Sequence, residues 1–365
     1  MRRGPIIVII FILLAAGVVG VSYFLQNQPP QEFSVAVNPL AEDWLREAVN
    51  RFNDTQPVVN ATQRIQFTVM VLDDLTIWQG TTTFTPENHP AAWVATSSVS
   101  VDYADRYSVV VPSVARTPLV WGGYNSRVTV ATDDSAFDWS AVQNAAQTES
   151  WSALDGGSQS WGFVQLAFPK ADTTMSGLGT LFSAAASYHQ NADISGTATR
   201  DNDFRDWLDP VIASVNFQTL GGDPAAGVAR GPATATMGLL PENLWLQNLN
   251  GLTDDAADSF VFSYPAYQFI LDFPVAGWGD ANQITDIERL AVQALGDWLT
   301  SEAEQAQAVA LGLRPAQGEP SETAARFAAA EPFGILLEPA YGEIITPPSR
   351  SEAAGLAQWF TQASR

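Results

Sequence analysis

Residues 161–190 read WGFVQLAFPKADTTMSGLGTLFSAAASYHQ, and this stretch joins a strand pattern to a helix pattern through a polar loop. The apolar run at 163–168 has the length of a buried strand and is stopped by Pro169. Apolar residues then recur at helical spacing from 178 to 188, which predicts an amphipathic helix. The stretch therefore predicts a strand, a loop and a helix that begins close to Ser176.

The loop before this helix carries hydroxyl groups and glycine, and no acid follows Asp172. Unpaired backbone N–H groups at a helix N-terminus attract an anion or a carbonyl oxygen. Small residues at this point would let a ligand approach the backbone closely. We therefore expect one half of a ligand site at Thr173, Thr174, Ser176 and Gly177.

Composition narrows the choice of function. The chain has 365 residues, 46% of them hydrophobic, and a net charge of −22. Its length suggests two or three domains, and so acidic a surface argues against nucleic acid as a partner. No cysteine is present, which excludes disulfides, a thiolate nucleophile and a lipidated-cysteine anchor. The only lysine, Lys170, stands at the mouth of the loop, where an exposed strand end is its simplest interpretation.

Motifs for catalysis and for cofactors are missing from the sequence. Residues 176–180 contain G-x-G but lack the third glycine of a dinucleotide fingerprint. There is no Walker A motif, no H-E-x-x-H, no G-x-S-x-G and no calcium-loop pattern. His89 and His189 have no ligand-like spacing, so we expect no zinc site. The sequence predicts a non-catalytic protein without a cofactor.

The N-terminus has the pattern of a membrane anchor. Arg2 and Arg3 precede an apolar run at 5–24, which matches the ~20 residues that a bilayer-spanning helix needs. The basic flank predicts an N-terminus inside the cell and the bulk of the chain outside the cytoplasm. A cleaved signal peptide, which would leave a secreted protein, is the alternative, but no clear A-x-A site follows the run. Residues 26–31 form a short polar tether.

Strand and helix patterns alternate in the first part of the chain. Strand patterns lie at 32–37, 63–72 and 91–96, and a helical stripe lies at 44–52. Such alternation predicts a mainly parallel sheet that helices cover on both faces. In sheets of this kind, ligands bind beyond the carboxyl ends of the strands.

Two of these strand ends carry polar or capping residues. Asn38 is a favoured helix N-cap, and Pro39 is favoured at the first helical position. The third strand pattern ends in a run of hydroxyl side chains. Ordinary capping and turn formation would explain each segment alone. Together they predict the other half of the ligand site at Asn38, Pro39, Thr96, Ser97 and Ser98.

Two acids complicate this half of the site. Glu42 and Asp43 stand in the first turn after the cap, where each complements the helix dipole by about 0.3–1 kcal/mol. If they face the ligand, they would repel a simple oxyanion. The sequence therefore leaves an oxyanion, a carboxylate and a sugar open as ligands.

Longer segments carry a resemblance to a known family. The chain is similar to extracellular solute-binding proteins of the type II periplasmic-binding fold, and most similar to the bacterial group often associated with von Willebrand factor A domains. The matching segments stand in the family's order and cover nearly everything after residue 32. They are AVNPLAEDWLREAVNRFN (36–53), PAAWVATSSV with DYADRY (90–107), RTPLVWGGYN (116–125), PKADTTMSGLGTLFSAAASY (169–188), SYPAYQFILDFPV (263–275), AVQALGDWLTSEAEQAQAVALGLRPA (291–316) and FGILLEPAYGEIITPPSRSEAAGLAQWF (333–360).

This resemblance implies two α/β lobes joined by a hinge that the chain crosses twice, with the ligand held between the lobes. Residues 1–31 would form the anchor and tether. Residues 32–118 and 264–365 would form the first lobe, and residues 119–263 the second. The family's ligand contacts match the two half-sites described above, and add a third position at Glu242 and Asn243.

The resemblance also implies a function. We expect a membrane-anchored extracytoplasmic protein that captures a small polar or anionic solute for uptake through an ABC permease. The alternative is a cell-surface sensor or assembly module of the same fold, which works with a von Willebrand factor A type partner and without transport.

Overall fold

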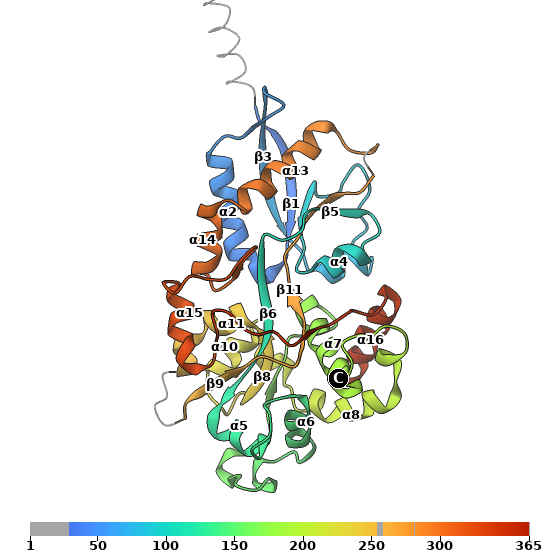
Figure 1. Cartoon of the computed structure of the whole chain (residues 1–365). Helices are drawn as coiled ribbons and strands as arrows, with labels where there is room; N and C mark the ends of the chain where they lie inside the picture. The colour runs from blue at the N-terminus through green and yellow to red at the C-terminus, as the bar shows by residue number, and fades with distance from the viewer. Residues whose placement is uncertain (1–28, 254–257, 281, 365) are drawn as a thin grey trace, which may run out of the picture.

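Two mixed β-sheets, each flanked by helices, form two lobes that stand one above the other in Figure 1. The computed structural model describes residues 29–253, 258–280 and 282–364. No helix within these ranges is long and apolar enough to cross a membrane. The membrane-spanning segment expected at 5–24 lies outside the described residues and stays a prediction.

The first lobe contains a sheet with the spatial order β2 (Val58–Val59), β3 (Gln63–Val71), β1 (Gln31–Val37), β4 (Ala92–Val94), β12 (Val275–Trp278) and β5 (Tyr107–Val111). Strand β1 is parallel to both neighbours, and Val35 is aligned with Val69 and with Ala92. Strand β12 is antiparallel to β4, because the chain enters it from the second lobe at the end where β4 finishes. The sheet is therefore mixed, whereas the sequence predicted a mainly parallel one.

The helices of the first lobe lie against this sheet. Helix α2 buries an apolar stripe from Trp44 to Phe52 at helical spacing, and it packs against β3. The indole Nε1 of Trp298 donates to the carbonyl of Ala48 at 3.1 Å and holds a second helix against α2. The helices are the short turn η1 (Pro39–Ala41), α2 (Glu42–Asp54), α3 (Asp74–Trp78), α4 (Ser98–Tyr103), α13 (Asp286–Leu299) and α14 (Glu302–Ala310).

The second lobe contains a sheet with the order β11 (Ile270–Leu271), β6 (Ala115–Tyr124), β8 (Met237–Pro241) and β7 (Leu166–Ala167), in which β9 (Phe260–Ser263) and β13 (Arg314–Pro315) also pair with β6. Only β7 and β8 are parallel. The strand expected at 163–168 shrinks to the two residues of β7. Phe163 is 69% exposed and pairs only with Ser150 in an isolated bridge.

Helix α7 (Met175–His189) is the central helix of the second lobe and begins where the sequence predicted. Its first twelve residues are all buried, because other helices and β-strands surround it. The other helices are α5 (Asn125–Thr132), α6 (Trp139–Gln147), α8 (Asn202–Ala213), α9 (Phe217–Leu220), α10 (Pro224–Ala229), α11 (Glu242–Gln247), α12 (Leu249–Thr253), α15 (Ala325–Ala330) and α16 (Arg350–Ala363). Smaller elements are four 3-10 turns (Trp151–Ala153, Gln159–Trp161, Ala198–Arg200, Glu331–Phe333) and the parallel pair β10 (Tyr267–Gln268) and β14 (Glu343–Ile344).

The chain passes between the lobes three times, where the sequence predicted two crossings. Strand β6 makes the first passage, and the step from β11 to β12 makes the second (Figure 1). The third runs from α14 to α15 through β13, where Arg314 is aligned with Arg116 of β6. After it, α15 packs against α11 and α16 packs against α8. The expected placement of all of 264–365 in the first lobe is therefore corrected: the segment from α15 onward packs on the second lobe, and Phe360 lies edge-on against Phe217.

The N-terminal end of α16 also holds the first lobe. The hydroxyl of Tyr103 donates to the carbonyl of Pro348 at 2.5 Å. Arg350 forms an ion pair with Asp105 at 2.6 Å and donates to the carbonyl of Trp78. We call these five residues the C-terminal clasp. Because the clasp joins the lobes at a place separate from the β6 and β11 crossings, it restrains how far they can separate.

Replacing Arg350 by Ala removes the charged half of the clasp. We expect the lobes to separate more, which small-angle X-ray scattering would detect as a larger radius of gyration. Thermal stability should change little, since a half-exposed ion pair contributes about 0–1 kcal/mol. Arg289→Ala is the matched control, because it removes an exposed pair with Asp286 inside α13. An unchanged radius in Arg350→Ala would contradict a restraining role.

Candidate functional site

A cavity of about 340 Å³ lies between the lobes, within the size range of small-molecule sites. The first lobe contributes the start of α2 and the ends of β3 and β4. The second lobe contributes the loop before α7, the loop before α10 and one face of α11. Its lining residues are Pro39, Leu40, Ala41, Glu42, Asp43, Trp44, Asp73 and Thr96 on one side, Pro169, Lys170, Thr173, Thr174, Met175, Ser176, Gly221, Gly222, Asp223, Pro224, Leu244 and Gln247 on the other, and Leu311 and Leu313 from the third crossing.

The half-site predicted on the second lobe lies largely on this cavity. Thr173, Thr174 and Ser176 all line it. The Thr174 hydroxyl oxygen accepts from the backbone N–H of Gly177 at 3.1 Å and so caps α7. Gly177 itself lies outside the wall. A β-carbon there would come within 2.6 Å of the backbone of Lys170, so the glycine allows close packing of the loop on the helix.

Only part of the half-site predicted on the first lobe lies on the cavity. Pro39 and Thr96 line the cavity. Asn38 is fully buried, where its Oδ1 accepts from the N–H of Ala41 at 3.1 Å and its Nδ2 donates to the carbonyl of Val94 at 3.2 Å. These bonds fix the turn that presents Pro39. Asn38 therefore acts as the N-cap that the sequence predicted.

Two predicted serines hold the adjacent loop. The Ser97 hydroxyl accepts from the N–H of Val99 at 3.3 Å and caps α4. The N–H of Ser98 donates to Oδ1 of Asp272 at 2.7 Å, and burial raises the pKa of that carboxyl. Neither serine lines the cavity, so their contacts connect α4 to the second crossing.

Two neighbouring acids that no sequence motif indicated, Asp73 and Asp74, stand beside Thr96. The Asp74 carboxylate is fully buried and accepts from the N–H of Thr96 at 2.8 and 3.1 Å. Burial raises the pKa of Asp74 to about 7. Its neighbour Asp73 lines the cavity, and burial raises its pKa to about 6. The first-lobe wall is thus acidic, and its acidity depends on pH.

Glu242 does not face the cavity. Its carboxylate accepts two bonds from the guanidinium of Arg314, at 2.7 and 2.9 Å, and both side chains are fully buried. The Tyr264 hydroxyl donates to the same carboxylate at 2.5 Å. Burial alone would lower the pKa of Arg314, but the bonds and charge of Glu242 outweigh it and raise that pKa. Glu242 therefore fastens the third crossing to α11.

Asn243 connects the lobes directly. Its backbone N–H donates to the hydroxyl of Thr117 at 3.1 Å, and that hydroxyl donates in turn to the Asn243 Oδ1 at 3.2 Å. The Asn243 Nδ2 donates to the carbonyl of Leu40 in the first lobe at 3.3 Å. Since Leu40 lines the cavity, Asn243 positions the wall without belonging to it.

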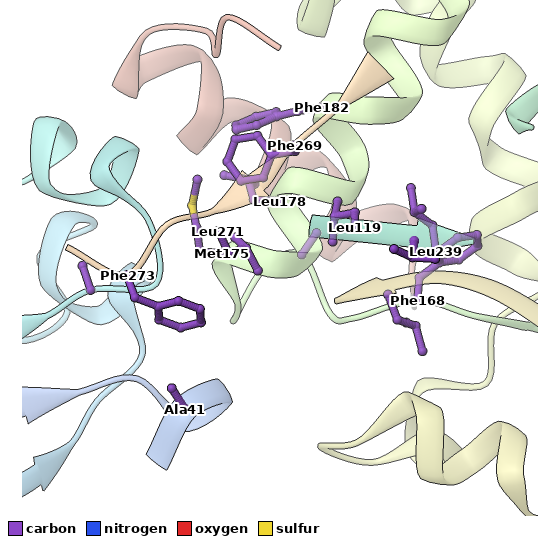
Figure 2. Packing of buried hydrophobic residues seen from close by; sticks show 14 of the residues in the cluster. Ala41, Leu119, Phe168, Met175, Leu178, Phe182, Leu239, Phe269, Leu271 and Phe273 are labelled. Atoms are coloured by element: carbon purple, nitrogen blue, oxygen red, sulfur yellow. The ribbon is translucent and has the colours of Figure 1, made fainter. Parts of the chain in front are cut away.

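Apolar side chains fill the region beside the hinge. Figure 2 shows this buried cluster, with Met175 of α7, Leu271 of β11 and Phe273 among its labelled members. Gly179 leaves room for Phe269, whose ring a β-carbon would meet at 2.3 Å. Phe273 has φ of 40°, which is strained for a bulky residue, and hydrogen bonds to Thr96 and Val114 hold it there. The cluster thus anchors α7 to the crossing strands.

The loop before α10 forms a part of the cavity wall that the sequence did not predict. Gly221, Gly222 and Asp223 line the cavity, and Asp223 Oδ1 caps α10 by accepting from the N–H of Ala226 at 3.1 Å. The signal was present in the sequence: Asp223-Pro224 repeats the N-cap and proline pattern of the predicted cap on the first lobe. This pattern alone does not say which helix ends meet.

Asp74→Asn tests the buried acid of the first lobe. Between the ordinary pKa of about 4 and the folded value of about 7, only the unfolded state is ionised, so stability falls as pH rises through this window. The slope attributable to one such group is about 1.4 kcal/mol per pH unit. We expect Asp74→Asn to lose much of this slope in urea unfolding between pH 4 and 7. Equal slopes in both proteins would contradict the raised pKa.

Glu242→Gln tests the hinge ion pair. Removing one partner of a buried pair leaves an uncompensated charge, and we expect a loss of roughly 3–5 kcal/mol in the free energy of unfolding. Glu47→Gln is the control, because Glu47 forms an exposed pair with Arg51. If Glu242→Gln kept its stability but lost solute binding, Glu242 would instead be a ligand residue.

No family model and no curated protein matches this sequence. Solved structures do match over almost the whole chain. Iron-bound HitA from Pseudomonas aeruginosa aligns with 92% of this chain and 99% of its own, at 12% identity and a TM-score of 0.55. Maltose-bound MalE3 from T. maritima aligns with 91% of this chain and 93% of its own, at 11% identity and a TM-score of 0.55.

A third structure is an ABC transporter solute-binding protein from Thermotoga lettingae bound with alpha-D-tagatose. It aligns with 92% of this chain and 94% of its own, at 12% identity and a TM-score of 0.55. At such identities the likeness establishes the fold, and the ligand of each structure belongs to that protein. The expected two-lobed α/β architecture is confirmed in its coarse form: the chain has the type II periplasmic-binding fold that these structures share.

Proposed function

We propose that this chain is a non-catalytic, extracytoplasmic solute-binding protein that captures a small polar solute between its lobes for uptake by an ABC transporter. The observation that carries the proposal is the interlobe cavity, to which both lobes contribute polar side chains. The structures that share its fold include a protein bound to maltose and a transporter component bound to alpha-D-tagatose. The apolar run at 5–24 would tether the protein at the membrane.

Five predicted residues are proposed as ligand contacts. Thr173, Thr174 and Ser176 present hydroxyl groups at the start of α7, and Pro39 and Thr96 lie on the first-lobe wall. Closure would bring these walls together around the ligand by a hinge motion about the crossing segments β6 and β11, within the limit that the C-terminal clasp sets. Ligand contacts on both walls would favour the closed state over the open one.

The ligand classes that the sequence left open stay open in this proposal: an oxyanion, a carboxylate and a sugar. No group of three or more histidine, aspartate or glutamate residues that could hold a metal ion occurs among the described residues. The iron bound by HitA belongs to that protein.

Blocking the cavity tests the proposal. A solute set that includes sugars, amines, carboxylates and sulfate is screened against the full chain by thermal shift. Thr173→Trp places a large ring in the cavity wall and should abolish any shift, because Thr173 is exposed and caps no helix. Thr62→Trp is the control, since Thr62 directly precedes β3, at the opposite end of the strand from Asp73, and does not line the cavity. We expect it to bind normally.

If no solute shifts the melting temperature of the unmodified chain, solute capture fails as the function. The alternative would then be a sensor or assembly module. Its association with a von Willebrand factor A type partner stays a prediction. If Thr173→Trp binds as well as the control, the solute site lies outside this cavity.

A further inference from the structure

The walls of the interlobe cavity carry more acidic than basic side chains. Four of the lining side chains are acidic, namely Glu42, Asp43, Asp73 and Asp223, and Lys170 is the one basic lining residue. A ligand enclosed here would therefore experience mainly negative charge. The question is which of these groups already have partners in the protein.

Most of them do. Glu42 forms an ion pair with Arg46 of its own helix at 2.5 Å. Asp223 caps α10 and also accepts from Nδ2 of Asn248 at 3.0 Å. Lys170 forms an ion pair with Asp172 at 3.4 Å. The lysine therefore has an acidic partner of its own, and the lining keeps an excess of negative charge.

Two carboxylates remain. Among the described residues, no hydrogen bond or ion pair reaches the side chain of Asp43 or of Asp73. Asp43 complements the dipole of α2, in whose first turn it stands, and so has a partial explanation. Asp73 stands at the N-cap of the short helix α3, but its side chain makes no capping bond there, and burial disfavours its charge.

The hydroxyl groups of the opposite wall complete the polar lining. Thr173, Thr174 and Ser176 stand there at the start of α7. The indole Nε1 of Trp44 also lacks an acceptor among the described residues, but it is buried, as are those of Trp78 and Trp93. The cavity therefore offers two carboxylates to a cation and hydroxyl groups to the polar part of the same solute.

We propose that the cavity binds a small organic cation, whose ammonium group lies against Asp43 and Asp73 and whose polar groups meet the hydroxyls of the cavity wall. This inference rests on the proposed solute-binding function. Closure of the lobes removes water from the Asp73 carboxylate, and a charge that loses water needs a partner. A cation supplies that partner, a neutral solute leaves the charge uncompensated, and an anion adds repulsion. The sequence predicted a polar or an anionic solute. The two carboxylates favour a polar solute with a positive charge over an anion.

Matched probes isolate the effect of charge. Glucosamine, glucose and glucuronate share one frame, as do ethanolamine, ethylene glycol and glycolate. Each is titrated into the full chain at pH 7, above the raised pKa of Asp73, by isothermal calorimetry. Within a frame we expect the amine to bind at least about tenfold more tightly than its neutral and anionic counterparts.

Variants connect this preference to the two acids. Asp73→Asn and Asp43→Asn should each weaken glucosamine binding by about ten- to hundredfold, since hydrogen bonds to charged groups are the stronger ones. Glu47→Gln removes the same charge from the exposed face of α2 and should leave binding unchanged. The melting temperature of each variant checks that it has folded.

The outcomes separate this inference from the proposed function. If a neutral or anionic probe, or sulfate, binds more tightly than the amines, the protein is a solute-binding protein but the cation inference is overturned. The same holds if both aspartate variants bind amines as well as the unmodified chain. If no solute of any charge binds, both the inference and the proposed function fail.

Discussion

The ion pair between Arg314 and Glu242 fixes the geometry on which the cleft depends. Both side chains are fully buried, and the guanidinium also donates to the carbonyls of Leu336 and Leu337. Two ions removed from water are stable together only if nearly all their donors and acceptors are satisfied, and here they are. The pair binds β13 to the start of α11, so the third crossing has one fixed register beside β6. The pair therefore fixes the third crossing to the second lobe, next to the part of the cavity wall that α11 supplies.

Around this joint, the polar residues of the cleft divide into two tasks. The side chains of Asn38, Ser97 and Asn243 form hydrogen bonds within the protein. These bonds fix the loops that form the cavity walls. Other groups, above all the carboxylates of Asp43 and Asp73, have no partner among the described residues. The same residue types thus serve as scaffold where their bonds are internal, and as candidate ligand contacts where they are not.

The helices and their caps could be predicted because their causes are local. Helix α7 begins where a Thr-Thr-x-Ser-Gly loop meets an apolar helical repeat, and α2 follows an Asn-Pro cap. The length of the strand expected at 163–168 could not be predicted, because it depends on how far a neighbouring strand pairs with it. Strand β8 pairs only with the two residues of β7. Likewise, an apolar stripe such as that of α16 shows that a helix is buried, but not against which lobe.

The sequence by itself determined the α/β class, the start of the central helix and the position of half of the cleft, because caps and periodicity act over a few residues. The tertiary structure decided which capped ends meet, that Glu242 belongs to the hinge, and that Asp73 and the loop before α10 line the cavity. These outcomes depend on contacts between residues far apart in the chain, such as Arg314 with Glu242, and on burial, which no local pattern encodes. Burial is also what turns an ordinary aspartate into a group that requires a partner.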